Sequence, residues 1–161
     1  MTKDIVPGFI YDIHSKDISA FEVLRRWHRD LATLAQQMHD YEVTHGTLSA
    51  RSSLAESSLK GIARDATRFL NKLGVTYPGW AFRDEYERAA VKHPGMTLDC
   101  DAHTDESRFY ALAEEVGEVA AALTYDNTQD TGHNADLIAE VTQVGALALA
   151  WLTRYQDGED R

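Results

Sequence analysis

The sequence predicts an all-α fold, a helical bundle of about five helices. Apolar residues recur at three- and four-residue steps over long segments, and no segment shows a convincing strand alternation. The 161 residues, 43% of them hydrophobic, suffice for one domain with a core of its own. We therefore expect an N-terminal arm over residues 1–18 and a single all-α domain over residues 19–161.

The arm is a mixed segment. Its apolar residues are interrupted by Pro7-Gly8. We predict that it packs on the domain, with room for a short extended piece. The alternative is an interaction arm that contacts a second subunit.

The first two helices have clear apolar stripes and clear ends. A stripe from Phe21 to Tyr41 predicts a helix over about 20–43, which His45-Gly46-Thr47 ends. Ser53 and Glu56 form a capping-box pattern for the second helix, with Ser49 as another possible cap, and Gly74 stops this helix.

Three further helices follow. Tyr77-Pro78-Gly79 is a predicted turn before a helix over about 80–92, and His93-Pro94-Gly95 breaks that helix. After a loop over 94–103, Thr104 or Asp101 could cap a helix over about 105–125. Residues 126–133 are polar and turn-like, and Asn134 could cap a final helix over about 135–156.

The composition excludes several classes of protein. A net charge of −10 argues against general binding to nucleic acids or anionic membranes, because phosphate groups attract basic surfaces. The single cysteine, Cys100, excludes a disulfide framework and a thiolate metal cluster. No signal-peptide pattern or membrane span is evident, so we expect a cytoplasmic protein.

Carboxylates at helical spacing are the main functional signal. Glu115 and Glu118 share one flank of the helix over 105–125, whereas Glu114 points away from the core. The last helix is apolar nearly all round, yet Asp136, Glu140 and Gln143 form one polar stripe on it.

The two stripes lie in matching register. In an antiparallel hairpin, Glu115 and Glu118 would face Glu140 and Gln143 at similar height, because each helical residue rises about 1.5 Å. Such an oxygen-rich cage suits Mg²⁺ or Mn²⁺ rather than Zn²⁺. The competing interpretation is a solvated acidic face, with Glu140 paired to an arginine.

These residues carry a family resemblance. The segment Glu114-Glu115-x-x-Glu118, followed by Glu140-x-x-Gln143 in an alanine-rich helix, resembles the MazG-like nucleoside triphosphate pyrophosphohydrolases of the all-α NTP pyrophosphatase superfamily. The likeness is greatest to short bacterial and phage members, which share a Lys-His segment (Lys92-His93 here) and a Leu-Thr-Tyr-Asp helix end. It covers about residues 84–155.

The resemblance implies a bundle that forms a homodimer or homotetramer and binds Mg²⁺, with Mn²⁺ as a possible substitute. It implies cleavage of NTPs or dNTPs into a nucleoside monophosphate and pyrophosphate. Glu115, Glu118 and Glu140 would be metal ligands, and Glu114 would support them or activate water.

The family's last aspartate is Gln143 in this chain. Gln143 could coordinate through its amide oxygen, Asp136 could supply the missing charge, or the metal site could be weakened. Short phage-like members often carry Gln at this place, which favours a tolerated variant.

Several residues are candidates for contact with substrate. Lys92, Arg88 and Arg108 lie near the carboxylates in sequence and could neutralise phosphate charge. Tyr125 or Trp80 could stack on a base, with core packing as the competing role. His93 could also touch substrate.

Two other functional classes compete with the enzyme. One is a non-catalytic helical module that binds a nucleotide or a protein partner, and the other is a purely structural helical oligomer. A basic ridge at Lys60, Arg64, Arg68 and Lys72 is most simply a solvated face, with contact to phosphates or to an acidic partner as the alternative.

Overall fold

The computed structural model describes residues 3–124 and 136–156. Within these residues the protein contains six helices and no strand, which confirms the predicted all-α class. The helices are α1 (Gly8–Tyr11), α2 (Ala20–His45), α3 (Ser53–Lys72), α4 (Pro78–Lys92), α5 (Asp105–Ala122) and α6 (Leu137–Gln156).

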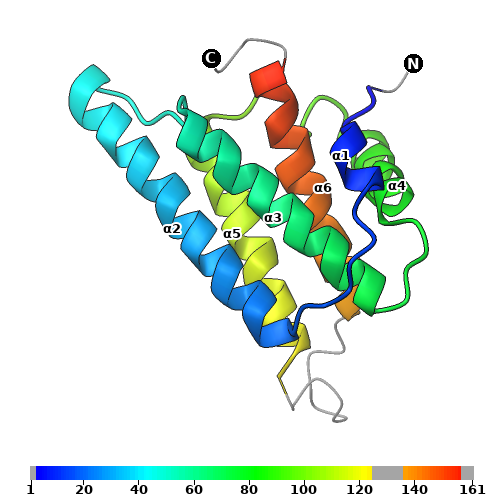
Figure 1. The fold of residues 1–161 in the computed structure, drawn as a ribbon. Helices are drawn as coiled ribbons and strands as arrows, with labels where there is room; N and C mark the ends of the chain where they lie inside the picture. The colour runs from blue at the N-terminus through cyan, green and yellow to red at the C-terminus, as the bar shows by residue number, and fades with distance from the viewer. Residues whose placement is uncertain (1–2, 125–135, 157–161) are drawn as a thin grey trace.

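The helices form a bundle with α6 packed against α3, α4 and α5 (Figure 1). Helices α2 and α3 run antiparallel, as do α5 and α6, and α4 stands at the side of α6. Helix α6 supplies much of the core, including Leu149 and Trp151, which have no exposed surface. None of the described helices combines the length and the apolar character needed to cross a membrane.

Most helix ends follow the predicted signals. Gly46 ends α2 with a φ of 81°, a left-handed conformation that favours glycine. Thr104 caps α5 by accepting a hydrogen bond from the Ser107 amide. Helix α4 begins at Pro78, two residues before the predicted start, because proline suits the first helical turn. Asn134 lies outside the described residues.

The predicted caps of α3 are wrong. The N-cap is Ser52, whose hydroxyl accepts from the Ala55 amide at 3.0 Å, so neither Ser53 nor Ser49 holds this position. Ser49 instead donates its hydroxyl hydrogen to Asp105 at 3.3 Å. Ser49 is thus engaged in a tertiary contact that its local sequence does not reveal.

The N-terminal arm packs on its own domain, against α3 and α4. It contains one short helix, α1, in place of the extended piece that we expected. Asn71 donates to the carbonyl oxygens of Ile13 and Ser15, and Lys72 donates to that of Ile18. The carbonyl oxygens of the arm are thus held by α3, while apolar side chains of the arm, such as Ile10, are buried in the core.

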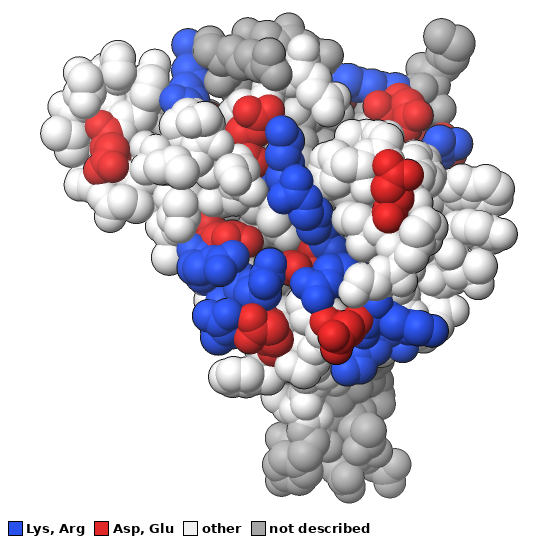
Figure 2. Space-filling model, viewed as in Figure 1, with Lys and Arg blue, Asp and Glu red and all other residues white. Residues whose placement is uncertain are grey.

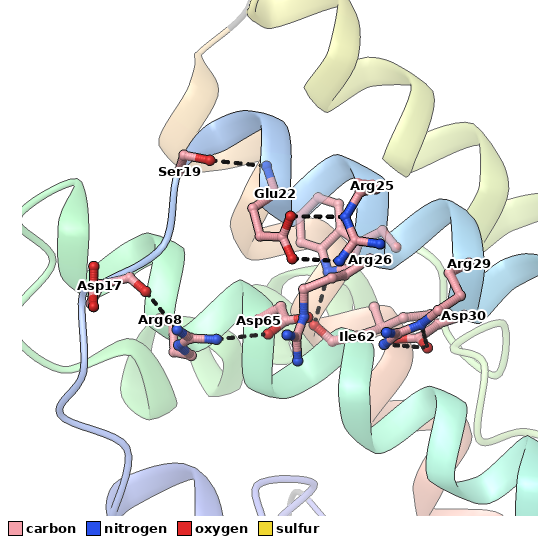
Figure 3. Close-up of polar contacts among 11 residues, drawn as sticks. Asp17, Ser19, Glu22, Arg25, Arg26, Arg29, Asp30, Ile62, Asp65 and Arg68 are labelled. Carbon is pink, nitrogen blue, oxygen red and sulfur yellow. Dashed lines mark hydrogen bonds and ion pairs between the residues drawn. The ribbon is translucent and has the colours of Figure 1, made fainter.

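A buried carboxylate joins α2 to α3 (Figure 3). Asp65 is 1% exposed and accepts from Arg26 at 2.7 Å and from Arg68 at 3.4 Å. Arg68 also donates to the Asp17 carbonyl at 2.6 Å, which ties in the arm. Because a buried carboxylate needs partners, this contact favours the observed pairing of the two helices.

The basic ridge of α3 is engaged in contacts within the chain. Lys60 pairs with Glu56, and the Arg64 guanidinium lies 5.1 Å from the centre of the Phe9 ring. Figure 2 shows that the basic side chains on this face alternate with acidic ones. This pattern is consistent with a solvated face whose charges are largely balanced.

Gly145 sets the distance between α4 and α6. A methyl group at this position would lie 2.2 Å from the Phe82 ring. We expect Gly145→Ala to lower the free energy of unfolding by about 1–3 kcal/mol, because the core has no space for the added carbon. Urea denaturation followed by circular dichroism measures this loss.

Gly117 provides the control, since a methyl group there would meet no atom within 4 Å. Gly117→Ala should leave stability unchanged or raise it, because alanine favours helix. Equal losses in both variants would contradict this account of Gly145.

Candidate functional site

A pocket of about 380 Å³ opens between α4, α5, α6 and the loop over residues 93–104. Glu114 and Glu115 of α5 line it together with Gln143 of α6. Arg88 and Lys92 of α4 line it as well. The pocket therefore combines carboxylates from α5 with basic side chains from α4.

The carboxylates of α5 and α6 meet as the hairpin register predicts. The Gln143 amide group lies 3.0 and 3.2 Å from the two carboxylate oxygens of Glu115, to which its NH₂ donates when it faces them. The side chains of Glu115 and Glu140 are also near enough to perturb each other's pKa. Two neighbouring carboxyl groups of this kind favour a proton on one of them.

Its surroundings make Glu115 a weaker acid than an exposed glutamate. Burial raises its pKa to about 7, and the charges of Glu140, Glu114 and Glu118 add to this effect. The pKa of Glu140 is also raised, chiefly by burial and next by Glu118. Glu115 and its three acidic neighbours therefore repel one another.

Positive charge is scarce in this cluster. Among the residues that the structure describes, no ion pair joins a lysine or arginine to Glu115, Glu118 or Glu140. The competing interpretation, in which an arginine pairs with Glu140, therefore has no support from the described contacts.

The other predicted metal ligands lie at the margin. Glu118 and Glu140 do not line the pocket, although the charge of Glu118 reaches both Glu115 and Glu140. Asp136 accepts hydrogen bonds from the amides of Ile138 and Ala139, so its carboxylate caps the start of α6. Its charge still raises the pKa of Glu140.

The structure does not bring Arg108 to the pocket. Its side chain is 2% exposed, and it donates to Asp105 at 2.8 Å and to the Leu98 and Cys100 carbonyls at 2.6 and 2.8 Å. Arg108 therefore holds the loop over residues 93–104 in place, a role that its sequence position did not reveal.

The remaining candidates for contact with substrate differ in whether they line the pocket. Lys92 and His93 line the pocket, whereas Trp80 does not. Trp80 is 57% exposed and packs on Tyr77 at 5.0 Å between ring centres. Tyr125 lies outside the described residues, so its predicted role stays a prediction.

A hydrogen-bonded group forms another part of the pocket lining. Tyr86 donates to Asp99 at 3.0 Å, and Thr97 donates to the other oxygen of Asp99 at 2.6 Å. Burial and the neighbouring Asp99 raise the pKa of Tyr86 to about 12, which keeps its hydroxyl protonated. His103 fixes the loop through the Met96 carbonyl at 2.6 Å.

Sequence reasoning missed Glu85. It lines the pocket, and its charge contributes to the raised pKa of Glu140. An isolated glutamate on a mostly polar helix gives no signal of this kind. The available hint was its spacing of three residues from Arg88, which is typical of a helical ion pair.

The donor set suits a hard divalent cation, because carboxylates and an amide oxygen are the ligands that Mg²⁺ accepts. Within residues 3–124 and 136–156, however, no three acidic, histidine or cysteine side chains are arranged to hold an ion in the conformation shown. Coordination by Glu115, Glu118 and Glu140 together would require rotation of these side chains.

A scan against protein-family models, a search of curated proteins and a search of solved structures each gave no match.

Proposed function

We propose that the protein is a Mg²⁺-dependent nucleoside triphosphate pyrophosphohydrolase that releases pyrophosphate and a nucleoside monophosphate. The observation that carries the proposal is the group of mutually repelling carboxylates on α5 and α6, at the edge of an open pocket that also contains basic residues. The resemblance of Glu114-Glu115-x-x-Glu118 and Glu140 to the MazG-like motif supports it.

Charge repulsion is the physical reason for a cation here. Half-buried carboxylates that lack basic partners cost stability unless they take up a proton or a cation. A cation bound by Glu115, Glu118 and Glu140 would replace the proton that the raised pKa of Glu115 favours. Gln143 would then be free to turn its amide oxygen towards the ion.

The other residues have roles that follow from their positions. Glu114 is exposed and lines the pocket beside Glu115, so it can orient or deprotonate an attacking water. Lys92, also exposed and lining the pocket, can neutralise phosphate oxygens. A bound Mg²⁺ would supply further charge neutralisation and would lower the pKa of a coordinated water.

An activity assay tests the proposal. We expect the wild-type protein to release pyrophosphate from at least one nucleotide in a panel of NTPs and dNTPs with Mg²⁺ or Mn²⁺. Glu118→Ala should lower kcat/KM by at least about 100-fold, because it removes a metal ligand. Chromatography of the products should show a nucleoside monophosphate rather than a diphosphate.

Glu42→Ala is the control, because Glu42 is an exposed glutamate of α2 outside the pocket lining. It should retain wild-type activity. The absence of turnover with every nucleotide would exclude the enzyme, and full activity in Glu118→Ala would exclude the proposed metal site.

The second candidate is a non-catalytic module that binds a nucleotide. The observation in its favour is Gln143, because an amide replaces a charged ligand and its NH₂ can donate to Glu115. This candidate predicts that Mg²⁺ with a nucleotide raises the melting temperature although no pyrophosphate is released.

A further inference from the structure

We propose that Arg88, held in place by Glu85, binds the terminal phosphate groups of the ligand, so that α4 contacts the polyanion while α5 and α6 hold the cation. This assignment rests on the proposed function, because it takes the pocket to be the binding site for a polyphosphate. It goes beyond that function by separating the anion-binding helix from the cation-binding pair.

The geometry of the Glu85–Arg88 pair is the first support. Arg88 donates through Nε at 2.8 Å and through one terminal nitrogen, Nη2, at 2.6 Å to the two Glu85 oxygens. A guanidinium has five N–H donors, and this pair uses two of them. The edge formed by the two terminal nitrogens stays available for a second oxyanion, and the held side chain loses less entropy on binding.

The location of Arg88 is the second support. Its side chain is 56% exposed, which leaves it accessible to a ligand, and it lines the pocket together with Lys92 one turn later. Arg108, the other candidate cation nearby, is committed to buried contacts. Among the residues that the structure describes, Arg88 and Lys92 are the lysine and arginine side chains of α4 that line this pocket.

The chain contains a closely matched control. Arg25 of α2 donates to Glu22 through the same atoms at 2.8 and 2.6 Å, with the same three-residue spacing (Figure 3). The Arg25 side chain is 52% exposed, close to the value for Arg88, but Arg25 lines neither described pocket. A comparison of Arg88→Gln with Arg25→Gln therefore distinguishes the effect of the arginine's position in the pocket from the effect of losing one positive charge.

Titration calorimetry with inorganic pyrophosphate, with and without Mg²⁺, tests the assignment. We expect Arg88→Gln to weaken pyrophosphate binding at least about tenfold, because it removes charge-assisted hydrogen bonds. The pyrophosphate affinity of Arg88→Lys should lie between those of the wild type and Arg88→Gln. Lysine keeps the positive charge but lacks the paired N–H donors of the guanidinium. Arg25→Gln should bind as the wild type does.

Three results would overturn the assignment. They are no pyrophosphate binding by the wild type, wild-type affinity in Arg88→Gln, and an equal loss in Arg25→Gln, which would indicate a general charge effect. Titration of Mg²⁺ alone gives an independent readout, and its affinity should not fall in Arg88→Gln. This readout also rules out a merely structural role, because a misfolded variant would lose both ligands.

The test also separates this inference from the proposed function. If Arg88 governs pyrophosphate affinity but no nucleotide is hydrolysed, the anion site stands and the enzyme is excluded. If nucleotides are hydrolysed and Arg88→Gln keeps wild-type pyrophosphate affinity and KM, the enzyme stands and the role of Arg88 is excluded.

Discussion

Glu115→Gln should make the protein more stable at pH 8 in the absence of divalent cations. The wild-type carboxyl has a pKa of about 7 in the folded protein, above the ordinary value of 4.5, because it is half-buried among other acids. The amide of glutamine has a similar shape and no charge. We therefore expect the free energy of unfolding to rise by about 1–3 kcal/mol after allowance for solvent screening.

The pH dependence follows from the direction of this shift. A raised folded pKa means that the folded protein holds the Glu115 proton more tightly than the unfolded chain does. The stabilising contribution is complete below pH 4.5 and is lost as the pH rises to about 7. The gain from Glu115→Gln should therefore be near zero at pH 4.5 and complete at pH 8, as thermal melts across this range would show.

Divalent cations should make the wild type more stable than Glu115→Gln, the reverse of the order expected without them. Wild-type protein should melt at a higher temperature when Mg²⁺ or Mn²⁺ is added, because a ligand that binds the folded state stabilises it. Glu115→Gln should respond much less, and Glu42→Gln should behave as the wild type. A cation response that is identical in all three proteins would place the binding site elsewhere.

Arg108→Met should destabilise the protein by about 3–5 kcal/mol, because it leaves the buried Asp105 without its charged partner. Arg108 and Asp105 are 2% and 8% exposed, so water cannot easily replace the lost contacts. The carbonyl oxygens of Leu98 and Cys100 would lose their donors as well. Chemical denaturation would measure the loss.

The exposed pair Glu22–Arg25 has the same three-residue spacing and provides the comparison. Arg25→Met should have little effect, because water solvates both groups at the surface. Full stability of Arg108→Met together with weaker pyrophosphate binding would instead support the sequence-based interpretation of Arg108 as a substrate ligand.

Periodicity made the bundle and the meeting of its carboxylates predictable. The apolar stripes located the five long helices, and the hairpin register expected for the last two helices placed Glu115 opposite Gln143, where the structure has them in contact. Both inferences need only helix geometry, because residues at equal distances from a hairpin turn lie at the same height.

Contacts between distant segments were not predictable. Ser49, a candidate cap of α3, instead donates to Asp105, which lies on another helix. The burial of Arg108 depends on loop carbonyls that only tertiary packing brings near. Glu85 lines the pocket from α4, a helix that packs closely on α6 at Gly145, and no local pattern on α4 encodes this packing.

The fastening of the N-terminal arm has a consequence for which positions can vary. At Ser15 and Asp17, α3 holds the carbonyl oxygens, which every amino acid possesses, while both residues are exposed. The constraint therefore falls on Asn71 and Arg68, which supply the donors. Substitutions should accumulate freely at these two arm positions during evolution, because the side chains that hold them belong to a helix more than fifty residues away.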